Sequence, residues 1–448
     1  MTKVNEPLAV REAPASYLVE LETQRVRPGY KQTEVGVIPE DWNQTTIGEI
    51  AAKVGSGMTP RGGSSKYEEY GRPFVRSQNI GWGRLLLGDI AYIDDETHST
   101  FSATELKEND VLLNITGASI GRSALADQKL VGGNVNQHVC IIRSNPNDAN
   151  PSFINYLLLS SLGQRQIDSF QAGGNREGLN FGQIRSIKLP LPPTKAEQEA
   201  IAEALSDADA LIYALEQLIA KKHHLKQGAM QELLTGKKRL PGFGGKWEVK
   251  AFNEICWFQE GPGVRNFQFT ASGIKLLNGT NIFRGVLNLE TTSRFISERE
   301  ARGAYAHFLA DAGDIVIASS GITIERFHEK VAFVGEADLP FCMNTSTIRF
   351  KPYSGILAPA FLYHFLTGDS FKRMIGGQAT GSAQLNFGPS HVAKVTVSLP
   401  PLTEQTAIAT ILSDMDTEIA ALETRLAKTR ALKQGMMHNL LTGKIRLV

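Results

Sequence analysis

Basic and amide side chains alternate with aromatic ones in the glycine-rich segment from Gly55 to Arg84. Arginine matches the acceptor pair on a guanine edge, whereas asparagine and glutamine match the donor and acceptor of adenine. Backbone N–H groups in glycine-rich turns can also meet phosphate oxygens, as the turns near Thr116–Gly121 and Gly173–Gly178 could do. This combination predicts a nucleic-acid surface; the alternative is a polar turn surface without a ligand.

Candidate DNA contacts occur in two separate stretches of the chain. In the first stretch they are Arg61, Lys66, Arg76, Gln78, Asn79, Thr116, Ser119, Arg122, Asn136, Gln137, Asn175 and Arg176. In the second stretch they are Arg265, Asn281, Arg284, Ser320, Arg326 and Asn344. The formal net charge of the chain is only +1. Because phosphate contacts normally dominate affinity, we expect basic residues to gather on one face, or a partner protein to add positive charge.

Residue patterns for catalysis are missing from the sequence. There is no P-loop GxxxxGK[ST], no HExxH and no EF-hand loop, and the [DN]PP[YF] loop of amino-methyltransferases is also absent. Cys140, Cys256 and Cys342 are scattered and form no CxxC pair, and the nine histidines are dispersed. We therefore predict no catalytic residues, no metal site and no cofactor bound by this chain.

A long helical pattern occurs twice, at an offset of 207 residues. Glu197–Leu240 and Glu404–Leu447 align without gaps, and 27 of the 44 aligned positions are identical. Apolar residues recur at spacings of four and three, which is typical of a coiled-coil seam. The seam residues are Ile201, Leu205, Ile212, Leu215, Ile408, Leu412, Ile419 and Leu422. No proline interrupts either pattern, so each predicts a helix of nearly 40 residues, roughly 55–60 Å long, with Gly236 or Gly443 as the C-cap.

The two segments that precede these helices are distant relatives of each other. NDVLLNITGASIGR (109–122) corresponds to GDIVIASSGITIER (313–326), and GLNFGQI (178–184) corresponds to QLNFGPS (384–390). Each segment has short alternating strands, such as Val139–Ile142 and Thr347–Phe350. Each also has one helical segment, at 151–170 and 358–375. We expect two α/β or α+β domains of about 150 residues with a shared scaffold and different loops.

Over nearly its whole length the chain resembles a specificity (S) subunit of type I restriction–modification systems. The resemblance rests on YKQTEVGVIPEDW (30–42), PFVRSQNI (73–80), NDVLLNITGASIGR, PPLTEQTAIA (400–409) and the two LLTGK endings. It implies an α+β fold with two α/β-type target-recognition domains. Two long antiparallel coiled-coil helices join these domains in a pseudo-twofold internal repeat.

The resemblance also implies a division of labour. Each recognition domain reads one half of an asymmetric bipartite site in double-stranded DNA. The helices set the spacer and dock two modification (M) subunits, and restriction (R) subunits complete the nuclease. S-adenosylmethionine belongs to the M subunit, and the S subunit has no catalytic residues of its own.

Five segments follow from these patterns: a leader at 1–28, either disordered or specific to this protein; recognition domain 1 at 29–193; helical region 1 at 194–240; recognition domain 2 at 241–401; and helical region 2 at 402–448. Two other readings of the sequence are a coiled-coil scaffold or interaction protein, and a self-contained DNA methyltransferase or nuclease. The missing catalytic motifs argue against the second. Apolar runs are too short for a membrane span and no signal-peptide core is present, so we expect a cytoplasmic protein.

Overall fold

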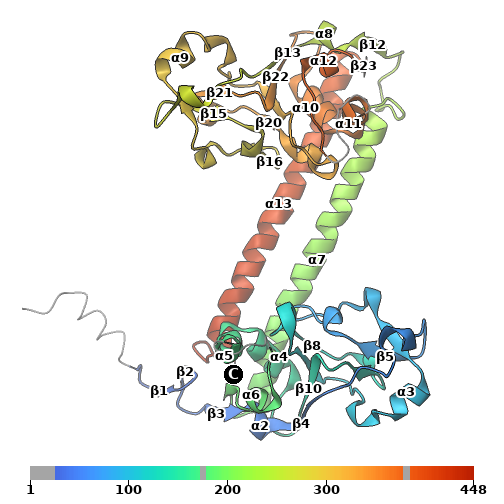
Figure 1. The fold of residues 1–448 in the computed structure, drawn as a ribbon, viewed down its shortest axis with the longest axis vertical. Coiled ribbons are helices and arrows are strands. Elements are labelled where there is room, and N and C mark those ends of the chain that lie inside the picture. Colours follow the sequence, from blue (N-terminus) through green and yellow to red (C-terminus); the bar gives the residue numbers. More distant parts are fainter. Residues whose placement is uncertain (1–25, 172–177, 377–383, 448) are drawn as a thin grey trace, which may run out of the picture. The chain divides into compact units, whose positions relative to one another are not determined.

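The computed structural model describes residues 26–171, 178–376 and 384–447. Asn175, Arg176 and most of the expected leader lie outside the described residues. The chain divides into two compact units (Figure 1): unit 1 comprises the residues up to 214 and from 426 onward, and unit 2 comprises 215–425. Each unit therefore contains one globular region and part of each long helix.

Globular region 1, in unit 1, is built around an antiparallel four-stranded sheet. Its strand order is β4 (Ala51–Ser56), β10 (Val139–Ser144), β7 (Val111–Asn114) and β8 (Ser123–Leu125). A three-stranded sheet contains β6 (Ala91–Ile93), β5 (Arg72–Val75) and β9 (Asn134–Val135). Two strand pairs are β1 (Tyr30–Thr33) with β2 (Gly36–Pro39), and β3 (Asn43–Thr46) with β11 (Lys188–Leu191). The helices are α2 (Ile47–Ile50), α3 (Asp95–Ser99), α4 (Pro151–Leu159), α5 (Ser161–Gln171) and α6 (Phe181–Arg185).

Globular region 2, in unit 2, repeats this plan. Its four-stranded sheet is β13 (Cys256–Glu260), β22 (Thr347–Pro352), β19 (Ile315–Ala318) and β20 (Val331–Phe333). A second sheet contains β14 (Phe269–Thr270), β18 (Phe295–Ile296), β15 (Ile274–Leu277) and β21 (Phe341–Met343). Two strand pairs are β12 (Glu248–Ala251) with β23 (Thr396–Leu399), and β16 (Ile282–Phe283) with β17 (Val286–Leu287). The helices are α8 (Phe252–Ile255), α9 (Glu298–Arg302), α10 (Pro359–Thr367), α11 (Asp369–Gly376) and α12 (Pro389–Val392).

The two long helices match the sequence prediction closely. α7 spans Lys195–Leu233 and α13 spans Leu402–Leu440, and each has 39 residues. Gly236 and Gly443 follow their C-termini with φ angles of 69° and 68°, a left-handed conformation that costs a glycine little. The predicted C-caps are therefore confirmed.

The seam prediction is supported at six of its eight positions. Ile212 and Leu422 are only half-buried; the buried ones are Ile201, Leu205, Leu215, Ile408, Leu412 and Ile419. In unit 2, Lys222 and Lys226 of α7 pair with Glu418 and Asp416 of α13, so the two helix segments run antiparallel there. A coiled coil along the full length of both helices stays a prediction.

The single helical segments expected at 151–170 and 358–375 are each two helices, so that prediction was wrong. The first breaks at Ser160 (ψ 162°) and the second at Gly368 (ψ 159°), where the backbone is extended. At the first break the Ser160 hydroxyl donates to the Leu157 carbonyl, which replaces a lost helical bond. α4 and α10 contact strands of the four-stranded sheets, and Ile167 of α5 and Phe371 of α11 lie in the same hydrophobic cores.

Each globular region shares its hydrophobic core with both long helices. In unit 1, Trp42 and Phe153 pack with Ile201 from the start of α7 and Leu440 from the end of α13. In unit 2 the roles are exchanged, because the core contains Ile408 from the start of α13 and Leu233 from the end of α7. The duplicated helices are thus integral parts of both cores.

A duplicated ion pair closes each of these junctions. In unit 1 the buried carboxylate of Glu197 pairs with Arg446, which also reaches Asp41 at 3.0 Å. In unit 2, Glu404 pairs with Arg239 at 2.6 Å. Each arginine also lies over a tryptophan ring, 5.6 Å from its centroid. Glutamate and arginine both recur at the offset of 207, so the repeated sequence carries this anchor.

Candidate nucleic-acid interface

The strand register of unit 1 brings three candidate segments to one edge of the four-stranded sheet. β4 ends at Ser56 opposite Cys140, and β7 ends at Asn114 opposite Val139, the first residue of β10. β8 begins beside them, because Ser123 pairs with Leu113. Three segments therefore meet there: the one after β4, the one between β7 and β8, and the one before β10. We call this edge loop edge 1.

The same construction recurs in unit 2 as loop edge 2. β13 ends at Glu260 opposite Ile348, and β19 ends at Ala318 opposite Thr347, the first residue of β22. The segments after β13, between β19 and β20, and before β22 meet at this edge. Segments far apart in the sequence are thus placed together.

Most described candidates lie at these edges. Arg61, Lys66, Gln137, Arg265, Ser320 and Arg326 are exposed, whereas Thr116, Ser119 and Arg122 are half-buried. Arg61 and Arg265 occupy matching places, four residues after a glycine that crosses closely under the neighbouring loop. A Cβ on Gly57 would lie 1.6 Å from the Val135 oxygen, and one on Gly261 would lie 2.3 Å from the Asn344 oxygen. Both crossings therefore require glycine.

A chain of polar side chains connects three segments of loop edge 1. Thr59 donates to Gln137 Oε1, Gln137 Nε2 lies 2.9 Å from His138 Nε2, and His138 Nδ1 lies 2.5 Å from the Thr116 hydroxyl. Thr59 and His138 were not among the sequence-predicted residues. A possible signal was that His138 directly follows the amide pair Asn136 and Gln137 at the start of a buried strand.

Four candidate asparagines are buried and brace turns, so the structure does not support them as direct DNA contacts. Asn79 Oδ1 accepts from the Arg76 backbone, and its amide donates to the Leu86 and Asp89 carbonyls. Asn281 repeats this arrangement with Asn278 and Asn288. At loop edges 1 and 2, respectively, the amide oxygens of Asn136 and Asn344 accept backbone N–H groups of the residues that follow them.

The remaining candidates have acidic or aromatic neighbours. Arg76 and Gln78 both contact the exposed carboxylate of Asp89, so the charge of Arg76 is partly neutralised. Arg284 and Arg326 both lie over the ring of Phe283, with guanidinium carbons 5.4 Å and 5.3 Å from its centroid. Arg326 also pairs with Glu329 at 3.0 Å. These groups form a cationic and aromatic cluster next to loop edge 2.

The aromatic residues of the first stretch differ in accessibility. Phe74 is fully buried, and Tyr67 lies beneath the Arg76 guanidinium at 5.4 Å. Trp82 is 57% exposed and Tyr70 is 82% exposed. Phe267, in the segment after β13, is 87% exposed and was not singled out from the sequence. Only the exposed rings are available to a ligand.

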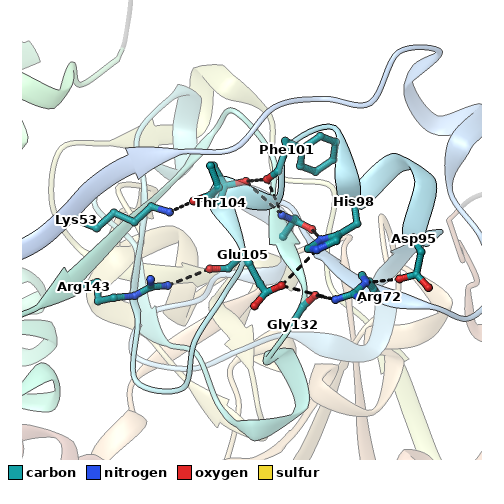
Figure 2. Close-up of polar contacts among 11 residues, drawn as sticks. Lys53, Arg72, Asp95, His98, Phe101, Thr104, Glu105, Gly132 and Arg143 are labelled. Carbon is teal, nitrogen blue, oxygen red and sulfur yellow. Dashed lines mark hydrogen bonds and ion pairs between the residues drawn. The ribbon is translucent and has the colours of Figure 1, made fainter.

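A polar network supports the lobe of globular region 1 that carries the first candidates (Figure 2). The buried ring of His98 lies 2.7 Å from Asn134 Oδ1 and 3.3 Å from Glu105 Oε2. Arg143 donates to the Glu105 carbonyl. It also binds Asp110 with two hydrogen bonds of 2.7 Å. In globular region 2, Arg349 and Asp314 occupy the equivalent positions on β22 and before β19, at 3.2 Å. We therefore assign these hydrogen bonds and ion pairs a role in holding the fold of each globular region.

Burial changes the acidity of two groups near loop edge 2. It raises the pKa of Glu260 at the end of β13, which favours the neutral acid relative to an exposed glutamate. It lowers the pKa of Lys330, whose ammonium donates to the Gly279 and Ile282 carbonyls. Neither shift is accompanied by the arrangement of acid, base and nucleophile that catalysis requires.

Two further searches of the described residues gave negative results. Groups of three or more His, Cys, Asp or Glu side chains placed to hold a metal ion do not occur in the described part of the chain. Within the same residues, every helix is too short or too polar to cross a membrane.

The fold and the two loop edges define a two-domain recognition protein with a repeated scaffold. Residues 39–226 and 244–429 match the family model of the type I restriction modification DNA specificity domain. The chain belongs to this family and is a DNA sequence-specificity subunit of a type I restriction–modification system.

Similar proteins cover almost the whole chain. The putative type I restriction enzyme MjaX specificity subunit of Methanocaldococcus jannaschii is 25% identical over 93% of this chain and 97% of its own length. The MjaVIII specificity subunit of the same organism is 26% identical over 92% of this chain and 94% of its own length. The S subunit from M. genitalium has this fold, with a TM-score of 0.56 and 16% identity over 89% of this chain and 96% of that one. A chain from a study of the assembly and conformational transition of the type I R-M system also has a TM-score of 0.56. It is 17% identical, and the match covers 91% of this chain and 99% of that chain.

Proposed function

We propose that the two globular regions each read one half of an asymmetric bipartite DNA site. In this proposal loop edge 1 and loop edge 2 face the DNA, and α7 and α13 set the number of base pairs between the half-sites. The chain has no catalytic residues of its own and directs an M subunit, which carries S-adenosylmethionine, to the adenine that becomes methylated. R subunits complete the nuclease.

The observation that carries this proposal is the contrast between a repeated scaffold and unlike loops. Both regions have the same four-stranded sheet, the same crossing glycine and the same anchor to the helices. The exposed segments on that scaffold differ: GMTPRGGSSKYEEYG follows β4, whereas GPGVRNFQF follows β13. Two different surfaces on one scaffold are suited to two different half-sites, since base edges are read by loop side chains.

The α7 and α13 surfaces also support the proposed docking of M subunits. Exposed apolar residues on the described helices include Leu211, Leu218, Leu225, Ile411 and Leu432. Leu225 and Leu432 are related by the offset of 207 and are 50% and 65% exposed. Two equivalent apolar positions on duplicated helices are suited to two copies of one partner.

A methylation assay with purified components tests the proposal. The chain alone should transfer no methyl group from S-adenosylmethionine to genomic DNA. The chain with its M partner should methylate adenines within one bipartite motif, and M alone should not. Methyl transfer by the mass-verified chain alone would show that it is an enzyme. Specific methylation by M without the chain would show that the sequence is read elsewhere.

A further inference from the structure

Both globular regions share one residue pattern in a single connection of the four-stranded sheet. This connection joins the second and third of its strands, counted in chain order: β7 to β8 and β19 to β20. β7 is followed by TGASIGR (116–122), and β19 is followed by SGITIER (320–326). Both read hydroxyl, glycine, apolar residue, hydroxyl, isoleucine, any residue, arginine. We call these segments grip turn 1 and grip turn 2. The pattern persists although the segments after β4 and β13 are unlike, so something other than a particular base sequence maintains it.

The two grip turns share a left-handed glycine at their second position, although grip turn 1 contains a 3₁₀ turn at Gly117–Ser119 and grip turn 2 leads into one at Ile324–Lys330. Gly117 has a φ angle of 68° and Gly321 has one of 69°. Grip turn 1 forms an isolated β-bridge from Thr116 to Gly178, and grip turn 2 forms one from Ile322 to Leu385. Each turn is thereby held against the LNF segment that both regions share.

The LNF contacts fix the turns through buried leucines and backbone hydrogen bonds. The Leu179 N–H donates to the Ile115 carbonyl at 2.9 Å, and the Phe387 N–H donates to the Ser319 carbonyl at 2.9 Å. Leu179 and Leu385 are 5% and 3% exposed. In unit 2 the Ser320 hydroxyl and the Gly321 N–H both donate to Asn386 Oδ1 at 2.9 Å. Both turns are therefore hydrogen-bonded at their bases.

The second hydroxyl and the arginine of grip turn 1 are available to a ligand. Within the described residues, Ser119 Oγ and the Arg122 guanidinium make no hydrogen bond or ion pair. In grip turn 2 the Thr323 hydroxyl is exposed and is likewise unpaired among the described residues. Arg326 is also exposed, and its guanidinium forms an ion pair with Glu329. A hydroxyl three residues before an arginine supplies two donors suited to one phosphate group, because hydroxyl and guanidinium groups are common partners of the DNA backbone.

We propose that the two grip turns bind DNA phosphates without reading bases, and so hold each half-site in the same register against its own loop edge. This inference rests on the proposed function and goes further by assigning these residues a sequence-independent role. Two regions that read different half-sites cannot share a base-reading device, but they can share a backbone contact, since every DNA sequence presents the same phosphates. Specificity is thereby left to the unlike segments after β4 and β13.

The test measures DNA binding by the complete complex with M. The variants are Arg122→Gln and Ser119→Ala in grip turn 1, with Lys129→Gln as control. Lys129 is exposed and follows the end of β8 at Leu125, which pairs with Val111 at the opposite end of the sheet from loop edge 1. Affinity is measured between 50 and 250 mM KCl for a cognate duplex and for one with both half-sites scrambled. Each lost phosphate contact should reduce the slope of log affinity against log salt by about 0.9. Arg122→Gln should weaken binding to both duplexes by the same factor, and Lys129→Gln should not.

A conservative substitution separates phosphate binding from base reading. Lysine binds phosphate as a point charge but cannot reproduce the bidentate arginine contact with guanine. Arg122→Lys should therefore restore most of the salt slope and leave the methylated motif unchanged in methylome sequencing. If Arg122→Gln instead relaxes one position of one half-site and lysine does not rescue it, the turn reads a base and the inference is wrong. An unchanged salt slope with Arg122→Gln would place the turn away from the DNA and also overturn it.

Failure of the inference and failure of the proposed function give different results. If the wild-type complex shows no bipartite motif, the proposed function fails before any variant is compared. If the wild-type motif is bipartite and Arg122→Gln behaves like Lys129→Gln, only the inference fails. Thermal unfolding of each variant confirms that the surface substitutions leave the fold intact.

Discussion

At the scale of single residues, burial separates side chains that are accessible to a ligand from side chains that hold the fold. Asn79 and Gln78 are adjacent and were equally good candidates from their types, yet Asn79 is buried in a turn and Gln78 is exposed. The sequence could not distinguish them, because the hydrogen bonds of Asn79 depend on a turn whose shape is set by later residues. Arg61 and Arg265 are exposed in the glycine-rich segments that follow β4 and β13, and their contact with DNA stays a prediction.

The cysteine thiols provide a residue-scale prediction. Burial raises the pKa of Cys140, Cys256 and Cys342 to about 12, so at pH 8 all three remain neutral thiols and lack the reactive thiolate. The native protein should react negligibly with Ellman's reagent at pH 8, and three thiols should react after denaturation. Rapid labelling of the native protein would contradict the burial of these groups.

The anchor between Arg446 and Glu197 supports a stability prediction. Glu197 is 2% exposed, so Arg446→Ala leaves a buried carboxylate without its charge partner. The free energy of unfolding in urea should fall by about 3–5 kcal/mol. Arg302→Ala, which removes an exposed pair with Glu298, is the matched control and should cost less than about 1 kcal/mol. Equal losses for the two variants would mean that the anchor is unimportant.

At the scale of elements, periodicity predicted the long helices well and the shorter ones less well. The α7 and α13 patterns are long and free of proline, and each forms a helix of 39 residues, close to the expected length. The breaks at Ser160 and Gly368 were missed because the apolar residues on both sides continue a helical pattern. Gly368 was a weak signal for a break, and Ser160 gave none. The loop edges depend on strand register, which joins residues more than 80 positions apart in the chain and leaves no local signal.

The helix C-caps provide an element-scale prediction. A Cβ on Gly443 would lie 2.5 Å from Pro39 Cγ, and one on Gly236 would lie 3.2 Å from Trp247 Cδ2. Gly242 also has a positive φ, of 86°, but has no atom within 4 Å of that position. Gly242→Ala should therefore show only the backbone cost, about 1–2 kcal/mol. Gly236→Ala should lose more and Gly443→Ala the most, as measured by urea unfolding. The reverse order would contradict the packing of the C-caps.

At the scale of the whole molecule, the duplication links stability to function. Each globular region needs the start of one long helix and the end of the other for its core. The helices can therefore change length near the boundary between the units, at Ala214 and Arg425, without disturbing either core.

The proposed ruler leads to a prediction about paired insertions. Seven residues of heptad sequence inserted after Ala214, together with seven after Arg425, keep the apolar period and add about 10.5 Å to each helix. At about 3.4 Å per base pair, the gap in the methylated motif should lengthen by about three base pairs, with both half-sites unchanged. An insertion into α7 alone should abolish activity by shifting one seam against the other. An active paired variant with the original gap would show that the helices are not the ruler.

The most direct test of the central claim is an exchange of one globular region. Residues 42–190 are replaced by the matching region of a related specificity subunit whose half-site differs, and the methylome is sequenced in cells that also express the M partner. The account predicts a new motif in which one half-site has changed and the other half-site and the gap are retained. A motif with both half-sites altered, or with neither altered, would contradict it.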